Sequence, residues 1–144
     1  MKNPGSGARH RARRAALQSL YQWQATGQAA SEIVDQFGAE DSFVNLDQDY
    51  FKRLLVGVID NVGDLDVSLT PFLNRPLRQV DPIERAVLRM AAFELTHCPD
   101  VPWRVIIDES VELARTFGAE QGHRFVNGVL DKLALSLRRQ IPAG

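Results

Sequence analysis

The start of the chain carries a cluster of cationic side chains whose spacing suits the binding of an anion. The cluster consists of Arg9, His10, Arg11, Arg13 and Arg14. No Pro, Gly or β-branched residue interrupts residues 8–24, so an α-helix is expected there. On that helix the charges surround the first turns, where like charges repel one another unless an anion neutralises them. A phosphate backbone fits such a cluster best, and a solvated basic tail is the alternative.

The positive charge is segregated from the rest of the sequence. Residues 1–31 hold five Lys/Arg and no acidic residue, whereas the whole chain has a net charge of −1, so residues 32–144 carry −6. Segregation of this kind gives a nearly neutral protein a local patch for a polyanion. Ala16, Leu20 and Trp23 form an apolar face later in the same helix. We therefore expect that helix to dock through its C-terminal half and to extend its basic half into solvent.

Two aromatic residues stand beside cations. Tyr21 lies on nearly the same helical bearing as Arg14, and Phe125 follows His123 and Arg124 directly. An aromatic ring next to arginines is a typical stacking platform for the bases of single-stranded RNA. The alternatives are that Tyr21 packs at the edge of the core and that Phe125 contacts a neighbouring helix.

Residue types for catalysis or metal binding occur without the spacing that such chemistry needs. His97 and Cys98 are adjacent, and sequence neighbours on a helix do not face each other. Asp108 and Glu112 share a helical face, which is more typical of a solvated acidic surface. The three histidines lie far apart, and the glycines form no phosphate loop. We therefore expect no enzyme activity, no metal and no cofactor.

The composition is that of an ordinary globular protein. Of the 144 residues 44% are hydrophobic and 24% are charged, a length and balance that fit one domain. The single cysteine, Cys98, excludes an internal disulfide and suits a reducing cytoplasm. No apolar stretch has the length of a secretory signal or a membrane span. The sequence predicts a cytoplasmic location and no membrane contact.

Apolar positions recur at helical spacing along most of the chain, which predicts an all-α fold. A disordered leader is expected over residues 1–7, and an exposed acidic loop over 38–46. The predicted helices cover residues 8–24, 31–38, 47–69, 81–97, 103–117 and 120–139.

Capping residues mark several of the predicted helix ends. Asp81 followed by Pro82 is the strongest helix start, and Glu84 can reach back to the cap amide. Ser31 is expected to cap the short helix that follows it. Gly128 falls inside the last helix, where it costs about 1 kcal/mol relative to Ala. We expect the close approach of a neighbouring helix or of a ligand at that point.

Three stretches together resemble the NusB family of transcription antitermination factors. They are residues 19–24, residues 83–91 and, most specifically, residues 117–131, which include Phe-Val-Asn-Gly-Val-Leu-Asp. The resemblance covers nearly the whole chain. It implies about seven helices in two helical subdomains sharing one core, a single domain over 8–140 with subdomains at about 8–80 and 81–140. The segment after Pro71 supplies the seventh helix in this prediction.

The resemblance also implies a function and its partners. Members of the family bind the boxA element in the leader of ribosomal RNA transcripts together with NusE, a small-subunit ribosomal protein. The heterodimer helps the RNA polymerase antitermination complex to read through terminators, and no reaction is catalysed. The free protein could form a homodimer through the surface that awaits NusE.

Family positions transfer to this chain residue by residue. Glu84 falls near the junction of RNA and NusE, although it is also the predicted capping residue. The implied RNA contacts are Arg9, His10, Arg11, Arg13, Tyr21, Phe72, Arg75, Arg89, Gln121, Arg124 and Phe125.

Three of these positions depart from the family pattern. His10 replaces an arginine, which makes one phosphate contact dependent on pH. Phe72 replaces a tyrosine and keeps the ring without the hydroxyl. Gln121 replaces an acidic residue, and the loss of a negative charge there favours RNA affinity.

Two other interpretations remain open at this stage. One is a NusB-like RNA-recognition domain of the kind that guides an rRNA methyltransferase, which both termini, read as natural ends, disfavour. The other is a helical scaffold whose arginines contact an acidic protein partner. The salt dependence of RNA binding separates these interpretations.

Overall fold

The computed structural model describes residues 4–139, and within them the chain is helical with no strand. The predicted all-α fold is therefore confirmed. The chain divides into two compact units, unit 1 (Met1–Asp60) and unit 2 (Asn61–Gly144). This division falls earlier than the predicted subdomain boundary near residue 80.

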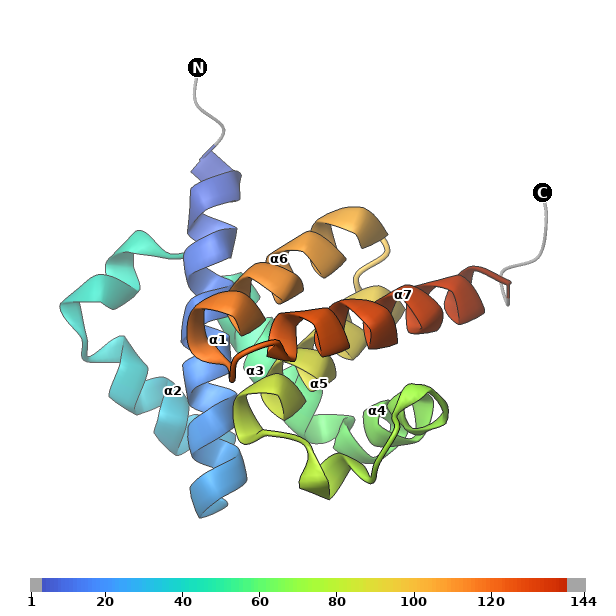
Figure 1. The fold of residues 1–144 in the computed structure, drawn as a ribbon. Coiled ribbons are helices and arrows are strands. Elements are labelled where there is room, and N and C mark those ends of the chain that lie inside the picture. The colour runs from blue at the N-terminus through green and yellow to red at the C-terminus, as the bar shows by residue number, and fades with distance from the viewer. Residues whose placement is uncertain (1–3, 140–144) are drawn as a thin grey trace. The chain divides into compact units, whose positions relative to one another are not determined.

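Unit 1 is built on a long first helix. Helix α1 (Pro4–Thr26) packs along α3 (Gln48–Asp60), and α2 (Ala30–Gly38) packs against both (Figure 1). A short 3₁₀ helix, η1 (Asp41–Asn45), joins α2 to α3. The largest buried side chains of this unit are Leu17, Leu20, Ile33, Phe51, Leu54 and Leu55.

Three local features of unit 1 differ from expectation. Helix α1 begins at Pro4, inside the predicted leader, and proline is tolerated in a first helical turn because its missing N–H has no partner there. Residues 1–3 lie outside the described residues. Helix α2 begins before Ser31, with Ala29 as its N-cap and no side-chain cap. The expected loop at 38–46 contains η1, which buries Phe43 in the core.

Unit 2 surrounds a central helix. Helix α5 (Pro82–His97) packs against α4 (Val62–Leu69), α6 (Trp103–Phe117) and α7 (Gly122–Arg139) (Figure 1). Two 3₁₀ turns, η2 (Thr70–Phe72) and η3 (Leu77–Gln79), connect α4 to α5. Since α5 is apolar around most of its circumference, it can be covered on several sides. Its buried residues include Ala86, Val87, Leu88, Met90, Ala91 and Ala92.

The predicted helix over 47–69 is wrong as a single element. It breaks at Asn61, whose backbone (φ −115°, ψ 15°) leaves the helical region before α4 begins. Asn is a favoured N-cap residue, and Gly63 two positions later weakens helix propensity. Residues 4–139 do contain seven α-helices, but the extra one is α4, whereas the segment after Pro71 forms only η2 and η3.

The cap signals in unit 2 are mostly confirmed. The Asp81 carboxylate accepts hydrogen bonds from the backbone N–H groups of Ile83 (2.9 Å) and Glu84 (3.3 Å), and Gly118 ends α6 as predicted. The prediction for Gly128 is not confirmed, because no neighbouring atom lies within 4 Å of a Cβ built at that residue. The prediction that a neighbouring helix approaches Gly128 is therefore wrong.

Candidate nucleic-acid interface

Four polar or aromatic side chains form an exposed row on α1, which we call the α1 stripe. The stripe consists of Arg11, Arg14, Gln18 and Tyr21, all of them exposed. Their separations of three, four and three residues keep them near one face, over about 15 Å of helix. Tyr21 is 43% exposed, which is unusual for a large aromatic side chain in a packed helix. The stripe therefore offers guanidinium groups for phosphates and a ring for a base.

Two of the predicted arginines contact the buried Tyr50 of unit 1, one of them buried and the other half-buried. The guanidinium carbons of Arg9 and Arg13 lie 4.6 Å and 5.5 Å from the centroid of the buried Tyr50 ring. Arg13 is only 3% exposed, and Arg9 also lies 3.9 Å from the Asp47 carboxylate. The expectation that the whole basic half of α1 extends into solvent is thus wrong for Arg13, whereas the Arg9 side chain stays 38% exposed. They fasten α1 to α3.

The contacts of Arg9 also involve a residue that our sequence reasoning missed. Asp47 caps α3 by accepting a hydrogen bond from the N–H of Tyr50 (3.0 Å), and its own N–H donates to the carbonyl of Ala8 (3.1 Å). An Asp before an apolar helical repeat is a readable cap signal. Its contact with α1 is not readable, because it depends on how the two helices pack.

The remaining positions of the arginine-rich segment are partly accessible. His10 is half-buried, and Arg11 is exposed. The Nε atom of Arg11 donates a hydrogen bond to the carbonyl of Asn45 (2.5 Å), which orients its guanidinium group along η1. Arg14, which the family pattern does not include, is exposed as well.

In unit 2 the structure brings together two residues predicted to contact RNA. The guanidinium carbon of Arg75 lies 4.4 Å from the centroid of the Phe125 ring, and its Nη1 atom donates to the side-chain oxygen of Asn74 (2.7 Å). Arg124 is exposed beside Phe125 at the start of α7. Gln121 is exposed in the turn before α7, with a positive φ of 69°. A cation stacked on a ring can present one flat surface to a base.

Two other predicted contacts in unit 2 have partners within the unit. Arg89 donates from Nε and Nη2 to the two carboxylate oxygens of Asp66, both at 2.9 Å, so it joins α5 to α4. Phe72 is half-buried in η2 and borders a shallow groove against α7 with Lys132 and Leu135. Asp66 is a second residue that sequence reasoning did not connect with the site.

Glu84 is buried, with 3% of its surface exposed, and holds the turn between α6 and α7. Its Oε2 atom accepts a hydrogen bond from the N–H of Ala119 (3.2 Å). Gly118 and Gly122 leave room for the carboxylate, since a Cβ at Gly122 would lie 2.4 Å from Oε2. Burial raises the pKa of the Glu84 carboxyl, and the charge of Arg75 opposes that rise. The Glu84 carboxylate therefore stabilises the turn before α7, and little of it is accessible to a partner.

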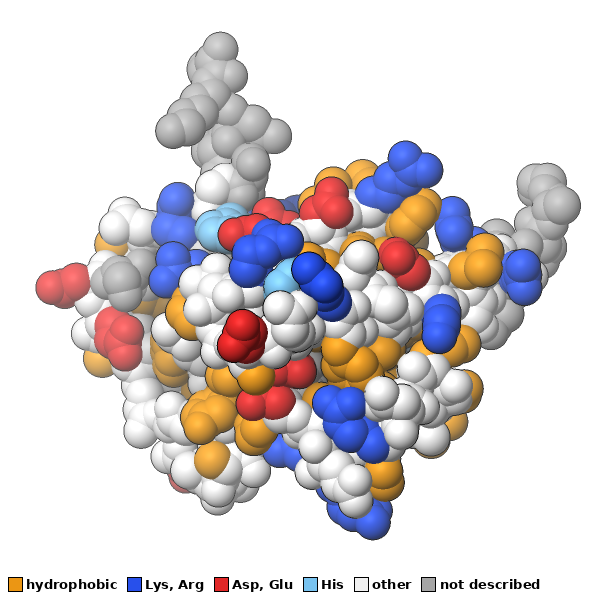
Figure 2. Space-filling model, viewed as in Figure 1, with side chains coloured by type: hydrophobic (Ala, Val, Ile, Leu, Met, Phe, Trp, Pro, Cys, Tyr) orange, Lys and Arg blue, Asp and Glu red, His pale blue; other side chains and the backbone are white. Residues whose placement is uncertain are grey.

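The wider surface carries both signs of charge. On the face drawn in Figure 2, basic and acidic side chains are interspersed, with apolar patches between them. Recognition of a polyanion on this face therefore depends on local clusters. Within residues 4–139, no group of three potential metal ligands lies together, and no helix is long and apolar enough to cross a membrane.

This all-α chain places exposed arginines and an exposed tyrosine in one row on a single helix. Such a row is typical of helical proteins that bind nucleic acid. The comparisons with known proteins narrow this class to one family. The chain belongs to the NusB family, whose model matches residues 10–135.

Relatives and solved structures agree with this assignment. The chain is 51% identical over 139 residues to the transcription antitermination protein NusB of Alcanivorax borkumensis, covering 96% of this chain and 93% of that protein. It superimposes on T. maritima NusB with a TM-score of 0.80 at 29% identity, covering 94% and 93% of the two chains. A structure of the antitermination factors NusB and NusE in complex with dsRNA has the same fold, with a TM-score of 0.77 at 22% identity over 91% and 98% of the chains.

Proposed function

We propose that this protein binds boxA-type RNA together with NusE and promotes read-through by RNA polymerase, as a non-enzymatic antitermination factor of the cytoplasm. The α1 stripe is the observation that carries the proposal, because it places two exposed arginines and an exposed ring in one row. Membership of the NusB family and the curated relative's name, transcription antitermination protein, support the same function.

Each cluster has a distinct part in this proposal. Arg11 and Arg14 neutralise phosphates, and Tyr21 stacks on a base. In unit 2, the Arg75–Phe125 pair offers a second stacking surface, and Arg124 beside it adds a phosphate contact. Arg9, Arg13 and Arg89 act on the RNA indirectly, because their guanidinium groups hold helices together.

Fluorescence anisotropy tests the proposal directly. The protein is titrated into labelled single-stranded boxA-type RNA, a scrambled strand and the duplex of the same sequence, each with and without NusE. The duplex is included because the solved NusB–NusE complex contains dsRNA. Tighter binding of the boxA strand, strengthened by NusE, is the expected result. Equal binding of all three RNAs, or binding of none of them, contradicts the proposal.

A matched pair of variants tests the role of Tyr21. Tyr21→Ala should weaken boxA binding by about 1–3 kcal/mol, because a stacked aromatic ring contributes that much per base. Val56→Ala is the control, since Val56 is exposed on α3 to a similar extent (39% against 43%) and lies outside the stripe. If Tyr21→Ala keeps full affinity with an intact fold, the ring is a packing residue at the edge of the core.

A further inference from the structure

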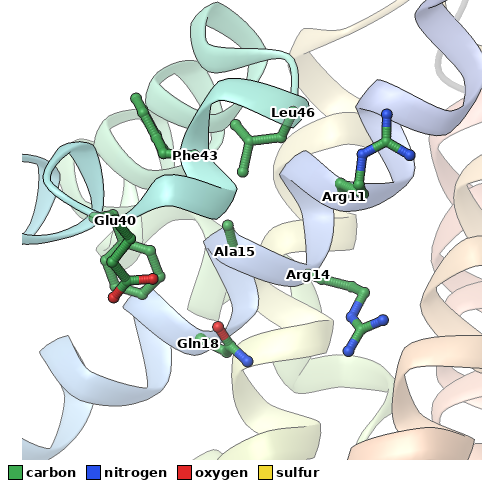
Figure 3. Close-up of a pocket in the computed structure, with 8 residues that line it drawn as sticks. Arg11, Arg14, Ala15, Gln18, Glu40, Phe43 and Leu46 are labelled. Atoms are coloured by element: carbon green, nitrogen blue, oxygen red, sulfur yellow. The ribbon is translucent and has the colours of Figure 1, made fainter.

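Beside the α1 stripe, unit 1 contains a pocket of about 270 Å³ between α1, the end of α2 and η1 (Figure 3). Helix α1 contributes Arg11, Arg14, Ala15 and Gln18 to its lining. A pocket of this volume lies just below the usual range for small-molecule sites, so it suits a single small planar group.

The apolar part of the lining is rigid. Phe37 and Phe43 both pack on the fully buried ring of Phe51, with ring centroids 5.7 Å and 5.4 Å from it. Ala15 adds only a methyl group on the α1 side, which leaves the space open. Aromatic walls fixed in this way lose little conformational entropy when a ligand enters.

The polar groups of the pocket have opposite charges at opposite ends. In Figure 3, Glu40 lies on one side of the pocket, whereas Arg11 and Arg14 lie on the other. The backbone of Glu40 is fixed by two hydrogen bonds, from its N–H to the carbonyl of Phe37 and from the N–H of Phe43 to its carbonyl, both 3.1 Å. The occupant therefore needs hydrogen-bond donors at one end and an anionic group at the other.

We propose that this pocket takes one nucleotide of the bound RNA and prefers a base with an exocyclic amino group, cytosine or adenine. The base lies against Phe37 and Phe43, its amino group donates to Glu40, and its phosphate meets Arg11 and Arg14. Gln18, exposed in the stripe, can donate to and accept from the base edge. This inference rests on the proposed RNA-binding function and adds to it a site that reads base identity.

Uracil is the base that the charge pattern disfavours. It presents a carbonyl oxygen where cytosine presents an amino group, and this oxygen would face the Glu40 carboxylate. A carboxylate accepts from the amino group of cytosine, and an amide such as Gln18 pairs with the edge of adenine. The opposite order would be expected if an arginine occupied position 40.

Mononucleotides test the pocket without the rest of the RNA. The full-length, ¹⁵N-labelled protein is titrated with CMP, AMP, UMP and ribose 5-phosphate, and NMR follows the side-chain amide of Gln18 and the Nε–H of Arg11. We expect CMP and AMP to bind at least about fivefold more tightly than UMP. Ribose 5-phosphate should bind more weakly still, because it lacks the base.

Three variants complete the experiment. Glu40→Gln should reduce the preference of CMP over UMP to about one, because the amide can also donate to uracil. Glu32→Gln is its matched control, an exposed carboxylate on α2 outside the pocket, and should leave the preference unchanged. Ala15→Leu should fill the pocket and abolish CMP binding, and Glu40→Gln keeps the test decisive if the leucine disturbs folding.

The outcomes separate this inference from the proposed function. Equal binding of CMP and ribose 5-phosphate would show that the arginines bind only phosphate and would overturn the base pocket. Binding of boxA RNA without any response to CMP would overturn the pocket and leave the proposed function standing. Selective CMP binding without RNA binding would overturn the proposed function and, with it, the role of the pocket in RNA recognition, and would leave only a mononucleotide site.

Discussion

Single residues show that a charged side chain in this protein can act for the fold as much as for a ligand. Glu84 is the clearest example, because its carboxylate is buried and bonded to the turn before α7. Since its pKa is raised in the folded state, the unfolded chain releases this proton first as pH rises. The contribution of Glu84 to the free energy of unfolding therefore falls between its unfolded and its folded pKa and becomes constant above the folded value.

Glu84→Gln should remove this pH dependence. The amide keeps an acceptor for the N–H of Ala119 but carries no charge to desolvate. Relative to the variant, the original protein should lose stability as pH rises above about 4.5, by about 1.4 kcal/mol for each unit by which the pKa is raised. Urea unfolding between pH 4 and pH 8 measures the difference. Parallel stability profiles would mean that Glu84 ionises as freely in the folded chain as in the unfolded one.

Arg89 allows a second test at the same scale. If its main role is to join α5 to α4 through Asp66, Arg89→Ala and Asp66→Ala should each lower the free energy of unfolding. The double variant should lose less than the sum of the two, with a coupling of about 0.5–3 kcal/mol. Strict additivity would mean that the ion pair between Arg89 and Asp66 does not stabilise the fold.

At the scale of elements, the two glycines of α7 provide a matched pair with opposite predictions. Gly128→Ala should stabilise the protein by about 1 kcal/mol, since the added methyl group meets nothing within 4 Å and Ala has the higher helix propensity. Gly122→Ala should destabilise it by about 1–3 kcal/mol, because the methyl group would overlap the buried Glu84 carboxylate. Thermal or urea unfolding measures both. Destabilisation by Gly128→Ala would contradict the open position of Gly128.

The helices also show which parts of the fold could be predicted from the sequence and which could not. Most helix bounds followed from apolar spacing and caps, as in α6, which ends at Gly118 as expected. Apolar spacing reports which face of a segment is buried but not whether its backbone is continuous. Leu65 and Leu69 keep the helical spacing beyond Asn61 and are buried, so the repeat over 47–69 suggested one helix where there are two.

The candidate site was predictable to a smaller extent, for a related reason. Residue types and spacing identified the basic helix, but they left open whether Tyr21 is a stacking ring or packs at the edge of the core, and the structure shows it exposed. They did not separate Arg13, which is buried over Tyr50, from Arg14, which is exposed. That distinction depends on where α3 lies beside α1, which is a tertiary contact between residues far apart in sequence.

For the whole molecule, the distribution of charge makes RNA binding sensitive to salt. Because the net charge is −1 and residues 32–144 carry −6, attraction to RNA must come from local basic clusters. The logarithm of the RNA association constant should fall linearly with the logarithm of salt concentration, with a slope of about −0.7 for each phosphate contacted. An RNA association constant that does not change with salt would mean that the basic clusters do not contact phosphates.

The slope also separates the arginines that meet phosphate from those that hold the fold. The double variant Arg11→Ala and Arg14→Ala should flatten the slope by about 1.4, because two contacts of about 0.7 each are lost, and should leave the unfolding free energy nearly unchanged. Arg13→Ala should leave the slope nearly unchanged and lower the free energy of unfolding, since Arg13 is buried against Tyr50. Anisotropy titrations over a range of KCl concentrations, paired with urea unfolding of the same variants, measure both quantities. If Arg13→Ala flattens the slope as much as the double variant does, the division of the basic cluster into exposed and structural arginines is wrong.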